Sequence, residues 1–501
     1  MDGKFMSTSI ITRFPVLAML GLAFLCVGSG LRADEASLQD ANGEWHDEKP
    51  NVLWILIEDW STDLSCYGTP LVQTPNIDKL ASEGIRFKRA FTTAPVCSTS
   101  RSAMMTGFHQ NYIGAHQHRT ANKKPLPFGI KPIPHLLEEA GYYTATMIGA
   151  KTDCNFTTPR PLFMGQHWKE RAAGQPFYVQ ATFAGTHRAF VRDPERPIDA
   201  DKVVLPPYYP DVPLARRDWA NGLETVQVVD RQVGQLLQQL EDDGLADNTI
   251  VFFIGDHGRC HIRGKQFLYD PGVRIPLIVR WPNHIQPGSV SNELVSSLDI
   301  CQTIVNVAGA TRVHELQGLY LFGKDVSARK YIHFNRDGMD DTHDAMRAVR
   351  TDRFKLIHNL MPERAYCQLN EYKEMQYPML SLMNVMNLQG KLNTAQARFM
   401  AASKPEFELY DLQDDPHEIN NLADDPQHAE VKAELLAEIN RWRAEVKDGG
   451  VTEEFRNGGW PATYPTKSLK EWQDELTQWE QALLVEGRAN RGGGAKKAKK
   501  K

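Results

Sequence analysis

The stretch Asn51-Val-Leu-Trp-Ile-Leu-Ile57, followed directly by Glu58-Asp59, decides the fold. An apolar run of this length, almost uninterrupted by polar residues, is typical of a strand buried on both faces of a parallel or mixed sheet. The same pattern returns in Thr249-Ile-Val-Phe-Phe-Ile-Gly-Asp-His-Gly258, where an apolar strand leads into Asp256-His257. Two strands of one type, each ending in a pair with at least one carboxylate (called an acidic pair below), predict an α/β sheet whose polar ends can meet.

Similar patterns fill the rest of the first 330 residues. Further strands are predicted at 143–149, 177–183 and 276–280, and helices at 77–83, 133–140 and 226–240. The alternation of strands and helices predicts a large mixed, mostly parallel sheet with helices on both faces. In such α/β sheets ligands bind outside the carboxyl ends of the strands, where both acidic pairs fall.

The two acidic pairs are therefore candidates for one metal site. Either pair alone is typical of a solvated turn, whereas two pairs on strands of the same type favour convergence. Carboxylates gathered without compensating Lys or Arg repel one another, and a hard divalent cation with oxygen ligands removes that repulsion. Ca²⁺ or Mg²⁺ is favoured over zinc, because no cluster of His or Cys has zinc-ligand spacing.

The first 33 residues are interpreted as a signal peptide. Lys4 and Arg13 precede an apolar run over 14–27, and small residues follow it. This run is too short to span a bilayer comfortably, and no later segment approaches about twenty apolar residues. We expect a periplasmic or secreted protein without a transmembrane segment.

The remaining chain divides into three predicted parts: a catalytic domain over 49–330, a smaller α+β domain over 331–486 and a disordered tail over 487–501. The tail carries seven Lys or Arg and no acid. The rest of the chain is therefore more acidic than the formal net charge of −5 indicates. The sequence contains no basic helix and no aromatic-basic stripe, which argues against nucleic-acid binding.

A single cysteine stands in Ala94-Pro-Val-Cys-Ser-Thr-Ser-Arg-Ser-Ala-Met-Met-Thr-Gly107, without a second cysteine at metal-ligand spacing. This segment resembles the sulfatase signature Cys-x-Pro/Ala-x-Arg, with Thr99 at the Pro/Ala position. Four further motifs in the same order strengthen the resemblance, and in style they are nearest to the sulfamidase and heparan-type bacterial sulfatases: Ile-Glu-Asp at 57–59, Gly-Asp-His-Gly at 255–258, the run from Arg-Gly-Lys to Ile-Pro at 263–276, and the Leu-Tyr-Asp-Leu to Asn-Leu-Ala segment at 409–423.

The resemblance implies an alkaline-phosphatase-like fold and a sulfuric ester hydrolase that removes sulfate from a sulfated polysaccharide or oligosaccharide. In this family a maturation enzyme oxidises the signature cysteine to formylglycine during export, so Cys97 is the expected nucleophile. The hydrated aldehyde has one oxygen to attack sulfur and a second hydroxyl whose deprotonation expels sulfate. The family usually has Pro or Ala at the position of Thr99, and that residue helps the unfolded signature fit the maturation enzyme.

The resemblance also implies a metal site and its ion. The expected ion is Ca²⁺, ahead of Mg²⁺, and it polarises the sulfate oxygen. The implied ligands are Glu58, Asp59, the modified Cys97, Asp256 and His257. Glu58 stands where many members have a first Asp, and His257 stands where the family has either Asn or His.

The catalytic residues implied by the resemblance surround that ion. Arg101 would hold the diol, Lys151 would stabilise the nucleophile, and Lys265 would bind the sulfate oxygens. His187 matches the family's active-site His after its strand and is the expected acid for the leaving group. Asp153 occupies the place of the family's second His, so either Asp153 or another residue is the base that releases sulfate.

Two other readings of the sequence remain. A phosphodiesterase or phosphonate hydrolase of the same superfold is one, because sulfate and phosphate esters share tetrahedral geometry. A non-catalytic binder of sulfated glycans is the other, and it would retain Cys97 as a thiol.

Overall fold

The computed structural model describes residues 49–149, 151–322, 328–339, 342–457 and 467–491. All of them belong to one compact unit, Ser37–Lys501. The predicted signal peptide lies outside the described residues. No helix in the described ranges is long and apolar enough to cross a membrane.

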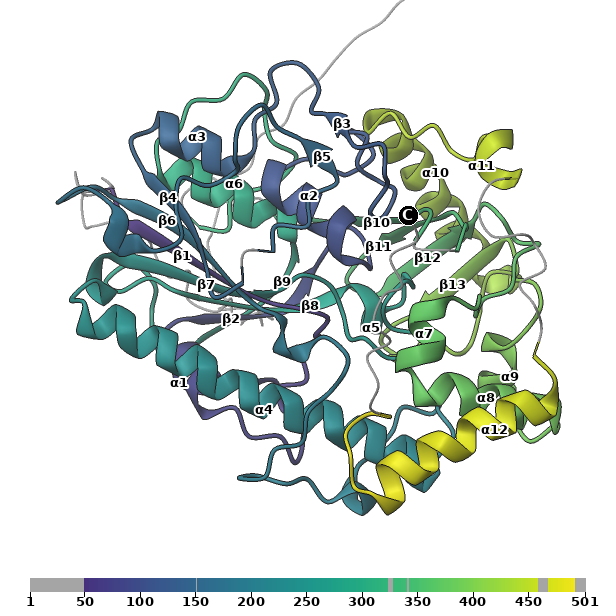
Figure 1. Ribbon diagram of the computed structural model, residues 1–501. Coiled ribbons are helices and arrows are strands. Elements are labelled where there is room, and N and C mark those ends of the chain that lie inside the picture. The colour runs from purple at the N-terminus through teal and green to yellow at the C-terminus, as the bar shows by residue number, and fades with distance from the viewer. Residues whose placement is uncertain (1–48, 150, 323–327, 340–341, 458–466, 492–501) are drawn as a thin grey trace, which may run out of the picture. The chain divides into compact units, whose positions relative to one another are not determined.

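A seven-stranded sheet in the order β4-β6-β1-β7-β8-β2-β9 is the centre of the fold (Figure 1). Its strands are β1 Asn51–Ile57, β2 Ile85–Phe91, β4 Tyr143–Met147, β6 Phe177–Phe183, β7 Thr249–Gly255, β8 Arg274–Arg280 and β9 Ser289–Ser296. The β4-β6-β1-β7 part is parallel, β8 runs antiparallel to β7 and β2, and β2 pairs parallel with β9. The predicted mixed, mostly parallel sheet is confirmed.

Helices cover both faces of this sheet (Figure 1). Alternate residues of β1 enter different cores, as a strand covered on both faces requires. Leu53, Ile55 and Ile57 pack with residues of α1 (Pro75–Ser82) and α4 (Pro213–Asp242). Val52, Trp54 and Leu56 pack with residues of α2 (Cys97–Thr106), α3 (Ile133–Glu139) and α6 (Ser297–Val307).

A second, antiparallel sheet in the order β10-β11-β12-β13 forms the C-terminal α+β part, as predicted. Its strands are β10 Ile332–Arg336, β11 Met346–Arg350, β12 Phe354–Asn359 and β13 Phe407–Asp411. Helix α10 (Ala429–Glu445) covers it through Leu435 and Ile439. The remaining elements are β3 Lys124–Pro125, β5 Phe156–Thr157, α5 Asp270–Val273, α7 Glu371–Gln376, α8 Pro378–Leu388, α9 Thr394–Phe399, α11 Glu453–Asn457 and α12 Leu469–Glu480.

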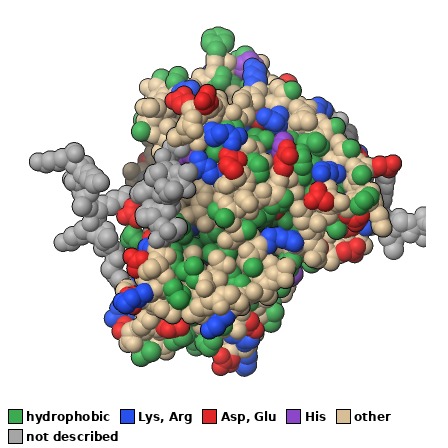
Figure 2. Space-filling model, turned by 90° about the vertical axis from the view of Figure 1, so that its right-hand side faces the viewer, with side chains coloured by type: hydrophobic (Ala, Val, Ile, Leu, Met, Phe, Trp, Pro, Cys, Tyr) green, Lys and Arg blue, Asp and Glu red, His purple; other side chains and the backbone are tan. Residues whose placement is uncertain are grey.

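Surface charges of both signs are interspersed on the face that Figure 2 shows. Of the predicted basic tail, residues 487–491 are described. Within them, Arg491 Nη2 donates at 3.0 Å to the carbonyl oxygen of Glu374, a residue of α7 (Glu371–Gln376). The six cysteines of the described ranges, from Cys66 to Cys367, are free thiols.

The central strand supplies a stability test. Leu53 is fully buried in the core between β1 and α4, so Leu53→Ala removes apolar contacts and leaves a cavity. We expect the free energy of unfolding to fall by about 2–5 kcal/mol, measured by urea denaturation. Phe128→Ala is the control, because Phe128 is 96% exposed and its removal should change stability by about 0.5 kcal/mol or less. Equal losses in the two variants would contradict the assigned core.

Candidate active site

The two acidic strand ends meet, because β1 and β7 are parallel neighbours in the sheet. The Asp59 amide donates to Asp256 Oδ1 at 2.9 Å, and the His257 amide donates to the same oxygen at 2.9 Å. One ligand atom from each of four buried residues falls within 4.8 Å of the others: Asp59, Cys97, Asp256 and His257. Of the five residues predicted as ligands, these four lie together, and Glu58 is not among them.

Helix α2 delivers Cys97 to this group as its first residue, and all ten residues of the helix are buried. Cys97 Sγ lies 3.3 Å from His257 Nε2 and 3.5 Å from Asp59 Oδ1. Ser100 fixes the helix against the end of β7 by donating to the Asp256 carbonyl oxygen at 2.5 Å. Thr99 donates to the Val96 carbonyl oxygen at 3.1 Å, which closes the start of the helix.

Basic side chains neutralise the two aspartates. Lys265 Nζ lies 2.8 and 3.0 Å from the Asp59 carboxylate oxygens, and Arg101 Nε lies 3.1 Å from Asp256 Oδ2. Burial alone would raise the pKa of Asp59, but the charges of Lys265, His187 and His257 hold it well below its usual range. Burial likewise opposes ionisation of Asp256, yet His257 and Arg101 lower its pKa to about 2. Both carboxylates are anionic at neutral pH.

Glu58 directly precedes Asp59, and its carboxylate faces the side chains of Lys151 and Arg101. Lys151 Nζ donates to Glu58 Oε2 at 2.7 Å. Arg101 Nη2 lies 3.1 Å from Glu58 Oε1 without the angles of a hydrogen bond, so this buried oxygen has an ionic neighbour but no hydrogen-bond donor among the described residues. An acidic oxygen left in this state has lone pairs available for a cation.

Asp153 forms an ion pair with Arg119, a residue that the sequence motifs did not single out. Arg119 donates to both carboxylate oxygens, at 2.8 Å from Nη2 and 3.2 Å from Nε, and Lys151 Nζ is 3.7 Å away. Burial works to raise the pKa of Asp153, but the hydrogen bonds and charge of Arg119 and the charge of Lys151 lower it. Asp153 is thus a weak proton acceptor near neutrality.

His187 follows β6 and reaches the same group from a third strand end. Its Nε2 lies 3.5 Å from Lys265 Nζ and 3.6 Å from Asp59 Oδ2, and its side chain is 25% exposed. The next residue, Arg188, anchors the segment by donating to both Asp218 oxygens at 2.7 and 2.8 Å. Arg188 Nε also donates to the Cys260 carbonyl oxygen at 2.8 Å. This guanidinium thereby joins the segments that carry His187 and Lys265 to helix α4.

Glycines allow the segment after β7 to fold back on itself. A Cβ on Gly258 would lie 2.0 Å from the Pro271 carbonyl oxygen, and one on Gly264 would lie 2.3 Å from that of Arg259. The turn is closed by the Lys265 amide, which donates to the Arg259 carbonyl oxygen at 2.8 Å. Glycine in the Gly-Asp-His-Gly and Arg-Gly-Lys motifs is therefore a steric requirement for placing Lys265 against Asp59.

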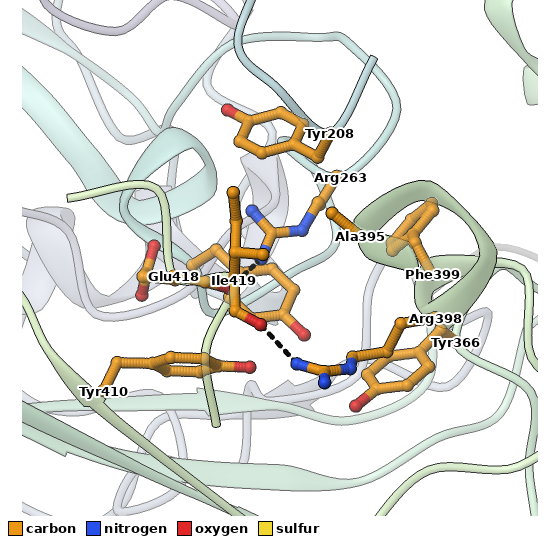
Figure 3. A pocket seen from close by; sticks show the side chains of 10 residues that line it. Tyr208, Arg263, Tyr366, Ala395, Arg398, Phe399, Tyr410, Glu418 and Ile419 are labelled. Atoms are coloured by element: carbon orange, nitrogen blue, oxygen red, sulfur yellow. Dashed lines mark hydrogen bonds between the residues drawn. The ribbon is translucent and has the colours of Figure 1, made fainter. Parts of the chain in front are cut away.

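Arg263 fixes the other side of this turn, in a separate tyrosine-lined pocket (Figure 3). Its guanidinium carbon lies 3.8 Å from the Tyr269 ring centroid and 4.4 Å from the Tyr208 ring centroid. Its Nη1 donates to the His417 carbonyl oxygen at 3.1 Å. None of the residues lining this pocket is a predicted site residue. Through Arg263 it links the Lys265 turn to the C-terminal part.

The donor set fits a hard divalent cation. Two anionic carboxylates and an imidazole converge in a buried space, and a further buried oxygen, Glu58 Oε1, borders it without a hydrogen-bond donor. Oxygen-rich ligation of this kind suits Ca²⁺ or Mg²⁺. The charges of Asp256 and Asp59 raise the pKa of His257 to about 10 despite its burial. A cation bound by these two aspartates and His257 would therefore displace a proton from His257.

The fold and this group of residues fit a metal-assisted hydrolase. A family model described as Sulfatase matches residues 50–159 and 162–310, and a model of the N-sulphoglucosamine sulphohydrolase C-terminal region matches 255–389 and 395–445. The chain belongs to the sulfatase family and is a sulfuric ester hydrolase.

Curated relatives agree with this assignment. An ulvan-active sulfatase of Formosa agariphila is 33% identical over 454 residues, which cover 80% of this chain and 76% of the relative. Human N-sulphoglucosamine sulphohydrolase is 26% identical over 79% of this chain and 90% of the relative. A phosphonate monoester hydrolase of Agrobacterium radiobacter shares the fold, with a TM-score of 0.59 and 19% identity over 81% of this chain and 98% of that chain.

The Arg188 anchor gives a second prediction. Arg188→Met leaves the buried Asp218 carboxylate without its bidentate partner. We expect the free energy of unfolding to fall by about 3–5 kcal/mol, measured by urea denaturation. In the double variant Arg188→Met/Asp218→Leu no unpaired charge remains, so part of the loss should be recovered. A single variant as stable as the wild type would contradict the anchoring role.

Proposed function

We propose that this sulfatase is an exported, Ca²⁺-dependent enzyme that removes sulfate from a sulfated polysaccharide or its oligosaccharides. The observation that carries the proposal is the placement of Cys97 Sγ 3.5 Å from Asp59 Oδ1 and 3.6 Å from Lys265 Nζ, inside the buried group of ligands. One relative is named an ulvan-active sulfatase and another an N-sulphoglucosamine sulphohydrolase, and these names support a carbohydrate substrate. Export rests on the predicted signal peptide.

Cys97 is the proposed nucleophile after conversion to formylglycine by a maturation enzyme of the host. The converted residue supplies a hydrated aldehyde, which can attack sulfur and later release sulfate without water attack on the enzyme. Arg101, on α2, and Lys151, in the segment after β4, hold positive charge beside the nucleophile. Burial would lower the pKa of Lys151, but the neighbouring Cys97 and Glu58 raise it, so its charge persists.

The proposed metal ligands are Asp59, Asp256, His257 and the modified Cys97, with Glu58 at their border. When bound, a divalent cation would supply charge that polarises a sulfate oxygen. Lys265 is proposed to bind sulfate oxygens, because its ammonium lies between Asp59 and His187, and burial does not prevent its charge: Asp59 and Cys97 raise the pKa of Lys265 well above its usual range.

His187 is the proposed acid for the leaving group. It is partly exposed and lies 3.5 Å from Lys265 Nζ, on the open side of the group. Its Nδ1 is 2.6 Å from the Arg188 carbonyl oxygen, which favours a proton on Nδ1 and leaves Nε2 to exchange the transferred proton. Of the two possibilities for the base, we favour a residue other than Asp153, because the pair with Arg119 stabilises its anionic form. Asp153 would then act by holding Arg119 and Lys151.

The first test combines maturation with turnover. Protein produced with a formylglycine-generating enzyme should show a lowered peptide mass at Cys97 and should release sulfate from members of a panel of sulfated oligosaccharides. Cys97→Ala should abolish the release, because it removes the nucleophile. Sulfate release from native protein with wholly unconverted Cys97 would contradict the mechanism. Hydrolysis of aryl phosphate with no action on any sulfate ester would instead favour a phosphonate or phosphodiester hydrolase.

The second test concerns the cation and needs no turnover. Chelator-treated protein should gain about 2.7 kcal/mol of stability at a Ca²⁺ concentration a hundred times the dissociation constant, read as a rise in melting temperature. Mg²⁺ at the same concentration should give a smaller rise. Asp256→Asn should remove the response, whereas the exposed Asp247→Asn should retain it. An unchanged Ca²⁺ response in Asp256→Asn would place the ion elsewhere.

A further inference from the structure

Tyr372 brings an aromatic ring from the C-terminal part into the active site. It lies on α7, far in the sequence from the catalytic motifs (Figure 1). Its ring centroid is 5.6 Å from that of His187 and 5.3 Å from Lys265 Nζ. These are the two residues to which the proposed function assigns the leaving group and the sulfate oxygens. The ring therefore borders the space where the sugar and its sulfate join.

The hydroxyl of Tyr372 is not available at the surface. Tyr372 is half-buried as a residue, whereas its hydroxyl oxygen is buried and has no hydrogen-bond partner among the described residues. The ring also packs edge-on against Tyr377, with centroids 5.6 Å apart and planes at 77°. The Tyr372 ring thus lies beside His187, whose side chain is itself 25% exposed.

Contacts at both ends of α7 hold the ring in this position. The Asn370 side chain caps the helix start by accepting from the Lys373 amide at 2.7 Å. At the other end, Arg188 Nη1 donates to the Gln376 carbonyl oxygen at 3.0 Å. Since Arg188 directly follows His187, one guanidinium fixes the separation between the His187 segment and the helix that carries Tyr372. A pre-positioned ring costs little conformational entropy when a ligand binds.

We propose that Tyr372 is a specificity-determining residue, whose ring is the wall against which the sugar bearing the scissile sulfate packs. This inference rests on the proposed carbohydrate substrate. The C–H face of a sugar ring is apolar and matches an aromatic ring, while the sulfate on its edge reaches Lys265. Mostly apolar lining with a few placed polar groups is the usual composition of a ligand pocket. The C-terminal part would then contribute to recognition of the sugar, and the sheet ends would carry the chemistry.

The test compares two substrates in fully matured protein: a sulfated oligosaccharide that the wild type hydrolyses and a small alkyl sulfate that has no ring. Tyr372→Leu keeps apolar bulk but removes the flat face. We expect the ratio of kcat/KM for the sugar to kcat/KM for the alkyl sulfate to fall about three- to tenfold, mainly through KM for the sugar. Tyr372→Phe keeps the ring and should hold this ratio closer to the wild-type value.

Two outcomes would overturn the inference. An equal fall for both substrates in Tyr372→Leu would mean that Tyr372 acts only by supporting Lys265 or His187. A loss in Tyr372→Phe as large as in Tyr372→Leu would mean that the hydroxyl, and not the ring, carries the contact. Tyr377→Phe is the matched control, since it removes a buried hydroxyl from the neighbouring ring and should leave the ratio unchanged. Wild-type protein that hydrolyses the alkyl sulfate but no sulfated sugar would instead refute the proposed substrate.

Discussion

The constraint on which the site depends is the burial of several carboxylates in one place. Glu58, Asp59 and Asp256 are 0–1% exposed. An unpaired buried charge of this kind lowers the stability of the fold by roughly several kcal/mol, even after the surroundings relax. Basic side chains from α2, from the segment after β4 and from the turn after β7 face these carboxylates. A divalent cation adds to the same balance. The acids, the bases and the ion site therefore form one electrostatic unit, in which the charge of each member depends on the others.

The topology supplies this unit from segments far apart in the chain. Parallel pairing of β1 with β6 and β7 places three carboxyl ends at one edge of the sheet, and each end is followed by a polar side chain of the site. Helix α2 adds Cys97 at its first residue, where the helix dipole favours an anion. Gly264 then lets the chain approach itself closely enough for Lys265 to return to Asp59. The position of each group follows from a backbone feature.

The sequence predicted the elements with strong periodicity. The apolar run at 177–183 became β6 with the same bounds, and the helical spacing around 226–240 marked the C-terminal half of α4. It missed β2, Ile85–Phe91, because charged residues interrupt that strand and obscure its apolar pattern. The motifs identified the carboxylates and Cys97, because these residues stand in short segments whose local chemistry can be read from the sequence. Arg119, Arg188 and Tyr372 escaped it, since their roles arise only from tertiary contacts between distant segments.

The departures from the family pattern are compensated within the structure. Glu58, longer than the Asp that many members have, reaches Lys151 at 2.7 Å, and Asp153, in place of a His, pairs with Arg119 at 2.8 Å. An acidic side chain in place of an imidazole would lower the positive charge around the nucleophile. The Arg119 side chain, 47% exposed, restores that charge and places it nearer to solvent. Positive charge on an exposed side chain attracts anions, so the Asp153–Arg119 pair would keep positive charge near the proposed sulfate site without a group that titrates near neutrality.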